Sequence, residues 1–212
     1  MSAVRPEFGP TLPELLGPRW RALPRAVRIA PLAAAALLAA VLLWALVVRD
    51  DGGGRVTVRE PVAFTFAYDA PLAQRPLRAG ELARVGAGRQ SLAVRKLELP
   101  PYRGDSAGFL PVYAVTLERG MAARHPGYLT RFEGRANVNR STGYEIGFQY
   151  RDGARTMYGR RIVLLPGPTA RQGLDLTLLS PRSRAVRSPS GVGRNDALRS
   201  ALFSFTLGTD PK

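Results

Sequence analysis

The residues best suited to catalysis form the motif Gly104-Asp-Ser-Ala-Gly108, which fits the G-x-S-x-G pattern of serine hydrolases. A serine nucleophile needs a histidine base within about 3 Å, and the chain has a single histidine, His125. A helix predicted over residues 106–125 would hold Ser106 and His125 about 28 Å apart. The motif therefore predicts the start of a helix, with Asp105 and Ser106 as capping residues, rather than a nucleophile.

Metal and cofactor chemistry has few residues available in this chain. There is no cysteine and only one histidine, so thiolate sites and multi-histidine metal sites are excluded. The acidic residues show no pair typical of a glycosidase or a metal site, and the glycine pairs at 86/88 and 191/193 lack a complete phosphate-loop pattern. We therefore expect no catalytic residue, no metal and no cofactor.

Arginine is the third chemical feature of the sequence. The chain has 31 Lys and Arg residues against 16 Asp and Glu residues, a formal net charge of +15, and arginine binds phosphate and carboxylate groups bidentately. The candidate anion-binding residues lie on or near a predicted strand over 155–165: Arg151, Arg155, Arg160 and Arg161. Further arginines decorate the late loop, at positions 182, 184, 187 and 194. The alternative is a dispersed, solvated surface that reflects a genomic bias toward arginine.

An uncharged segment near the N-terminus predicts a membrane anchor. Residues 29–48 contain no charged side chain, and as a helix they would span about 30 Å, the thickness of a bilayer's hydrocarbon core. Trp20 and Trp44 lie near its two ends, as membrane-interface residues often do. A soluble helix would show a polar face and a signal peptide would have a shorter apolar core, so an uncleaved transmembrane helix is favoured.

The distribution of charge predicts the orientation and the domain organisation. Residues 1–28 carry five arginines and two glutamates, and the positive-inside rule places this Pro- and Arg-rich tail in the cytoplasm. A Gly-rich tether over 49–57 and an extracytoplasmic α+β domain over 58–208 would follow. Because an exported domain rarely meets nucleic acid, we do not expect nucleic acid as a partner.

Hydrophobic periodicity predicts the elements of the exported domain. Alternating apolar residues indicate strands near 62–68, 91–99, 128–138, 144–150, 155–165 and 174–178. Apolar positions on one face predict the helix over 106–125, and a short helix over 195–203 precedes a last strand at 203–207. This order predicts an α+β fold, in which a mostly antiparallel sheet carries a packed helix.

The same order of elements resembles the PsbP-like family, including its small lipoprotein-type relatives exported by bacteria. The resemblance rests on the opening segment 64–69, the helix 106–125, the segment Thr142-Gly-Tyr-Glu-Ile146 and the closing stretch 198–207, and it covers residues 60–207. The chain departs from the pattern because no tryptophan follows the opening strand and because its anchor is a helix rather than a lipid. The resemblance implies a PsbP-like sandwich with an accessory, assembly or binding role and no particular site.

Taken together, these features predict a single-pass bacterial membrane protein whose extracytoplasmic domain is not an enzyme. The domain would bind an envelope partner or assist assembly close to the membrane. One alternative is an envelope enzyme of the hydrolase class with an unrecognised site, and another is binding of anionic lipid or wall polymer through arginine-rich faces. A cleft with converging polar groups would favour an enzyme, and shallow pockets would favour a binding domain.

Overall fold

The computed structural model describes Leu38 and residues 52–208 of the chain. Residues 52–208 belong to one compact unit of the chain, Asp51–Lys212. Several sequence predictions lie outside the described residues: the tail 1–28, all of the segment 29–48 except Leu38, and the interface residues Trp20 and Trp44. Among the described residues, no helix is both long enough and apolar enough to cross a membrane.

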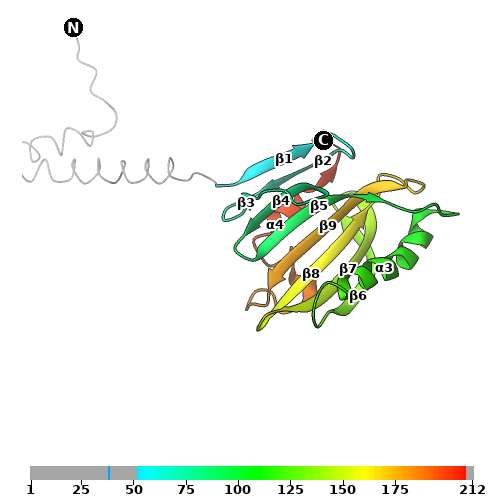
Figure 1. The fold of residues 1–212 in the computed structure, drawn as a ribbon. Helices are drawn as coiled ribbons and strands as arrows, with labels where there is room; N and C mark the ends of the chain where they lie inside the picture. The colour runs from blue at the N-terminus through cyan, green and yellow to red at the C-terminus, as the bar shows by residue number, and fades with distance from the viewer. Residues whose placement is uncertain (1–37, 39–51, 209–212) are drawn as a thin grey trace, which may run out of the picture. The chain divides into compact units, whose positions relative to one another are not determined.

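Seven strands form the main sheet of this unit. They are β3 (Ala73–Gln74), β4 (Glu81–Ala87), β5 (Gln90–Glu98), β6 (Leu129–Val138), β7 (Ser141–Asp152), β8 (Arg155–Leu164) and β9 (Gln172–Pro181). Their order across the sheet is β3-β4-β5-β9-β8-β7-β6 (Figure 1). Every neighbouring pair is antiparallel. Long central strands with alternating apolar residues can therefore bury both faces of this sheet.

A smaller sheet and the helices cover the main sheet. The small sheet contains β1 (Gly54–Val58), β2 (Phe64–Tyr68) and β10 (Thr206–Leu207), with β2 in the centre. Helix α3 (Ser106–Ala122) packs against β6 and β7, and the short helix α4 (Arg199–Phe203) packs against β2. The 3-10 turn η1 (Pro189–Gly191) packs against β7 and β8. The result is a layered α+β sandwich (Figure 1).

Two hydrophobic cores lie on the two faces of the main sheet. On β8, Met157 and Val163 belong to the core under α3, whereas Tyr158 and Ile162 belong to the core shared with the small sheet. This division follows from the alternation of side chains along a strand. All members of both cores lie between residues 56 and 207. Because the described residues of this unit build both cores among themselves, we expect residues 51–212 to fold on their own.

The predicted fold class is confirmed: a mostly antiparallel sheet carries a packed helix. The end of the predicted tether 49–57 is wrong, because β1 begins at Gly54 and pairs with β2, and because Val56 packs against the core. Strand β4 is not predicted by the sequence pattern. Its buried positions include Glu81 and Gly86, which interrupt the apolar alternation by which strands are recognised.

Candidate functional site

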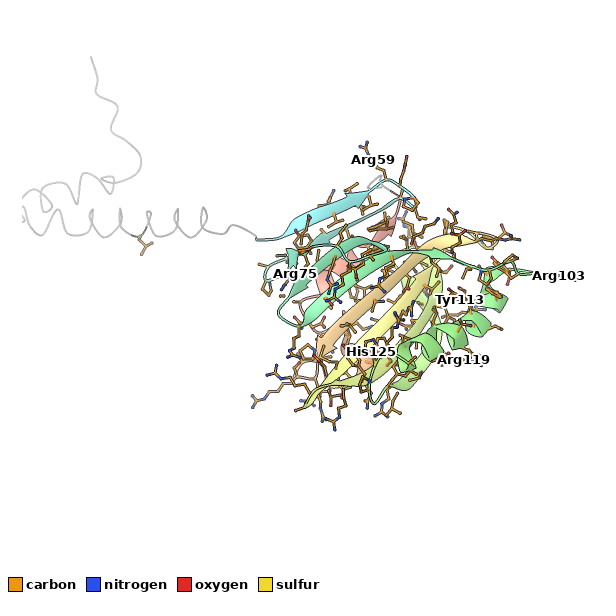
Figure 2. All side chains as sticks on the ribbon, in the orientation of Figure 1. Arg59, Arg75, Arg103, Tyr113, Arg119 and His125 are labelled. Atoms are coloured by element: carbon orange, nitrogen blue, oxygen red, sulfur yellow. The ribbon has the colours of Figure 1, made fainter. Side chains whose placement is uncertain are left out.

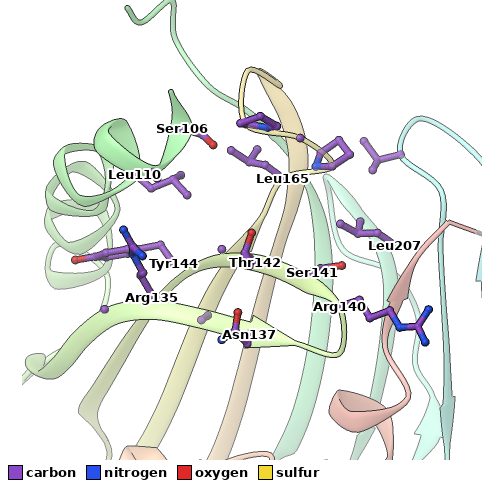
Figure 3. A pocket seen from close by; sticks show the side chains of 18 of the residues that line it. Ser106, Leu110, Arg135, Asn137, Arg140, Ser141, Thr142, Tyr144, Leu165 and Leu207 are labelled. Carbon is purple, nitrogen blue, oxygen red and sulfur yellow. The ribbon is translucent and has the colours of Figure 1, made fainter. Parts of the chain in front are cut away.

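A cavity of about 1090 Å³ lies where α3 begins, beside the end of the β6–β7 hairpin (Figure 3). One wall is the first turn and a half of α3, and the neighbouring loop 165–168 forms another. The hairpin contributes residues 134–137 and 140–144, and residues 62 and 63 before β2 and residues 207 and 208 at the end of β10 complete the lining. This volume is slightly above the usual range for small-ligand sites. We call this cavity the cleft.

The cleft combines an apolar wall with neutral polar groups and two cations. Its apolar lining includes Leu110, Pro111, Leu165, Pro166 and Leu207. Its polar lining includes Ser106, Asn137, Ser141, Thr142 and Tyr144, and its cations are Arg135 and Arg140. No carboxylate, imidazole, amine or thiol is among the described residues that line it. The cleft therefore has the mixed character of a ligand site but offers no ordinary general base.

Local hydrogen bonds hold the α3 wall of the cleft in place. Asp105 is the N-cap, with an extended backbone (φ −100°, ψ 164°), and its Oδ1 accepts a hydrogen bond of 2.9 Å from the Gly108 amide. The Ser106 amide donates to the Pro168 carbonyl at 2.7 Å, which ties the helix to the neighbouring loop. Ser106 itself is 8% exposed, and its hydroxyl points into the cleft (Figure 3). The motif that suggested capping thus also places a hydroxyl in the cleft.

The β6–β7 hairpin forms the floor. Asn139 occupies its turn with φ 52°, a left-handed conformation that asparagine tolerates. The Asn139 side-chain amide donates to the Phe205 carbonyl and so fastens the turn to the chain just before β10. In Figure 3, Asn137 and Thr142 point into the cleft, whereas the Arg140 guanidinium extends away from its centre. The floor is therefore polar, and one of its cations lies at the rim.

The structure does not bring a base to Ser106. His125 follows the far end of α3, and seventeen helical residues span about 26 Å. The His125 ring lies against the Tyr150 ring, with 4.3 Å between their centroids and 39° between their planes. His125 is not among the residues that line the cleft. Ser106 and His125 therefore cannot form a nucleophile–base pair in this fold.

We expect His125 to make the stability of the domain depend on pH. Burial, followed by the charge of Arg124, lowers the pKa of His125 from its ordinary 6.5. The unfolded chain then binds the proton more tightly, so the free energy of unfolding should fall as the pH drops through 6.5 toward the lower folded pKa. His125→Phe keeps a ring against Tyr150 and should remove this dependence.

Urea unfolding of residues 51–212, compared at about pH 7.5 and about pH 5.5, tests this expectation. The wild-type midpoint should fall on acidification by more than the His125→Phe midpoint. An equal fall in both proteins would mean that His125 is not the group responsible.

The four predicted anion-binding arginines do not form a site, because side chains alternate along β8. Arg160 is 4% exposed and donates to Glu145 at 3.1 and 2.5 Å, and to the Val192 carbonyl at 3.0 Å. Arg161 points to the other face and donates to Asp175 at 2.9 and 2.5 Å. Arg151 and Arg155 are exposed at the β7–β8 turn. The prediction is wrong for Arg160 and Arg161, since both charges are buried and already neutralised.

Other arginines are spread around the domain. Figure 2 shows Arg59, Arg75, Arg103 and Arg119 at widely separated points on its outline. Positive charge is therefore not concentrated on one face by these residues. An anion site in this domain requires a local arrangement of arginines rather than the overall charge.

Comparison with known proteins places the fold. No protein-family model and no curated protein matches the sequence. Cyanobacterial PsbP (CyanoP) from Synechocystis sp. PCC 6803 has a similar structure, with a TM-score of 0.50 and 11% identity over 73% of this chain and 92% of that chain. LpqN from Mycobacterium tuberculosis, described as involved in cell envelope biogenesis, matches with a TM-score of 0.46 and 11% identity over 76% of this chain and 94% of that chain. The described domain therefore has the PsbP-like fold that the order of its elements resembles.

Proposed function

We propose that the domain is a non-catalytic ligand-binding domain, and that the cleft takes an anionic amphiphile, meaning an acyl chain with a negatively charged head. The observation that supports this proposal most is the lining of the cleft. It joins an apolar wall to hydroxyl, amide and guanidinium groups, and its described residues include no carboxylate. Such a lining attracts an apolar chain and a negative head but supplies no proton acceptor of ordinary strength.

The apolar wall suits the chain of the ligand. Leu110 projects from α3, Leu165 from the neighbouring loop and Leu207 from β10, and all three line the same space (Figure 3). Each methylene that moves from water to such a surface contributes about 0.8 kcal/mol. A cavity of about 1090 Å³ has room for many methylenes. An elongated chain therefore uses this cleft better than a small polar metabolite would.

The floor and rim suit the head of the ligand. Arg135 and Arg140 form no ion pair with a described residue, so both guanidinium groups can pair with a ligand. Burial, followed by the charge of Glu133 and a hydrogen bond to its carboxylate, raises the pKa of Tyr144, so the Tyr144 hydroxyl stays neutral and the head would pair with the guanidinium groups. Charge-assisted hydrogen bonds from guanidinium groups are the stronger class of hydrogen bond. The head of the ligand would therefore lie toward the β6–β7 hairpin.

The location of the domain remains part of the proposal. The uncharged segment 29–48 and the arginines before it favour a single-pass anchor with an extracytoplasmic domain. Only residues 49–53 separate that segment from Gly54, a reach of at most about 22 Å. The domain would thus bind its ligand close to the membrane of a bacterial envelope, as an accessory to a partner.

An envelope hydrolase is the competing function. The cleft is larger than a shallow pocket, and Ser106 lies in it, which are the features that would favour an enzyme. A serine hydrolase also needs a base beside the serine and donors for the oxyanion. The described lining offers Ser106 no histidine, carboxylate or lysine. A binding function is therefore preferred, because it does not require a base beside Ser106.

Fluorescence titration of residues 51–212 with dansylaminoundecanoic acid tests the proposed function. We expect saturable binding, and we expect Ala107→Trp to weaken it at least about tenfold, because Ala107 lines the cleft and an indole would fill its mouth. Thr116→Trp is the matched control. It places the same side chain at another exposed position of α3 outside the cleft and should leave the affinity unchanged.

The methyl ester of the same probe distinguishes the contribution of the apolar chain from that of the charged head. Arg135→Gln with Arg140→Gln should weaken binding of the acid more than binding of the ester, because only the acid carries a negative charge. Equal affinity of Ala107→Trp and wild type for the acid would refute the cleft as the binding site.

A further inference from the structure

A second, smaller cavity lies on the other face of the main sheet. Its volume is about 300 Å³, and it lies between the start of β6 and the segment that leads into η1. Tyr158 at its base belongs to the core shared with the small sheet, not to the core under α3. No carboxylate is among the described residues that line it. We call this cavity the notch, and it is distinct from the cleft.

Two arginines line the notch, and both are held in place through Nε alone. Arg131 on β6 donates from Nε to the Gln149 side-chain oxygen at 2.9 Å. Arg187 donates from Nε to the Arg184 carbonyl at 3.2 Å. Neither forms an ion pair with a described residue, unlike the buried Arg160 and Arg161. The Nη groups of Arg131 and Arg187, four N–H donors on each side chain, are therefore available to a ligand.

Two serine hydroxyls complete the lining. Ser188 Oγ and Ser190 Oγ lie 2.8 Å apart and share one hydrogen bond. Since each hydroxyl carries one hydrogen, the acceptor in this pair keeps its own hydrogen free to donate. The notch thus offers two guanidinium groups and a hydroxyl donor, with no negative group among the described lining residues.

We propose that the notch binds a phosphate group carried by a phosphate monoester or diester. Two unneutralised guanidinium groups with an added hydroxyl match the several oxygens and the charge of a phosphate. The cavity is near the lower limit for ligand sites, so it would hold the phosphate while the rest of the ligand extends into solvent. This site is independent of the amphiphile proposed for the cleft.

Nuclear magnetic resonance titration of residues 51–212 with inorganic phosphate tests the site. We expect saturable shifts of the Ser188 and Ser190 amide signals. Arg131→Gln with Arg187→Gln should weaken the affinity at least about tenfold, while Arg155→Gln, an exposed arginine outside the notch, should not change it. Urea midpoints of all three proteins verify that each variant is folded. The proposal would be overturned if the wild type showed no shifts, or if the double variant bound phosphate as tightly as the wild type.

A vesicle experiment identifies the source of the phosphate. Residues 51–212 are sedimented with vesicles of phosphatidylglycerol or of phosphatidylcholine. Retention on phosphatidylglycerol that is lost in the double variant assigns the site to a lipid headgroup. If wild type and double variant are retained equally, while the double variant has lost the shifts caused by inorganic phosphate, the site is assigned to a soluble phosphate ester.

Discussion

Replacing Asp175 with asparagine is expected to lower the free energy of unfolding of residues 51–212 by about 3–5 kcal/mol. Asp175 is 4% exposed, and its two carboxylate oxygens accept hydrogen bonds from Nε and Nη2 of Arg161. Removing this charge leaves the Arg161 charge buried without compensation. The expected loss is large because a typical domain is stable by only about 5–15 kcal/mol.

The surroundings of the pair prevent Arg161 from losing its charge by deprotonation. Burial lowers the pKa of Arg161, but the Asp175 carboxylate outweighs it and holds the pKa above its ordinary value. The pair lies on the α3 face of the sheet, where the charges of Arg161 and Asp175 shift the pKa of Tyr113 in opposite directions. Without Asp175, the guanidinium can neither lose its proton nor reach water without disturbing the packing of α3.

Urea unfolding of the variant and of two controls measures this effect. Asp152→Asn removes the acid of an exposed pair with Arg89, whose side chains are about half exposed, and should cost at most about 1 kcal/mol. Arg161→Leu with Asp175→Leu removes both charges and should recover most of the stability lost in Asp175→Asn. If Asp175→Asn and Asp152→Asn cost the same, burial does not govern the energetics of this pair.

The acidic partners of Arg160 and Arg161 could not be predicted from the sequence. Arg160 and Arg161 are adjacent, and their neighbours suggested a cationic surface. Their partners, Glu145 and Asp175, lie on β7 and β9, and only the register of three strands brings each acid diagonally across from its arginine. Register depends on packing over the whole sheet. The sequence therefore contains the four charged residues but not the pairing that neutralises them.

The elements themselves were more predictable than the sites. Phe64, Phe66 and Tyr68 alternate plainly, and the apolar face of residues 106–122 indicates a helix, because local periodicity reports burial directly. The cleft joins α3, the loop 165–168, the β6–β7 hairpin and β10, which are far apart in the chain. Local patterns located Asp105 and Ser106 but not the cavity that Ser106 lines. The notch likewise depends on Arg131 meeting the late loop.

The second large effect is expected for Gly159→Ala, which should destabilise residues 51–212 by about 1–3 kcal/mol or more. Gly159 on β8 faces Phe148 on β7 across the sheet. A Cβ atom at Gly159 would lie 2.2 Å from Phe148 Cζ, well inside contact distance. Phe148 is 1% exposed, and its ring lies between those of Tyr128 and Tyr150, at centroid distances of 5.6 and 6.3 Å. Because the ring is buried between two other rings, moving it would disturb their packing.

Two further variants separate this overlap from the general effect of replacing a strand glycine. Gly134→Ala adds a methyl group to β6, where a Cβ would meet nothing within 4 Å, and it should be neutral or slightly stabilising. Phe148→Leu alone should be destabilising because it removes aromatic packing, but Gly159→Ala should cost less in that background than in the wild type. Urea midpoints give the coupling between the two positions. Additive effects would show that the Phe148 ring is not the obstacle, because a steric overlap disappears with the group that causes it.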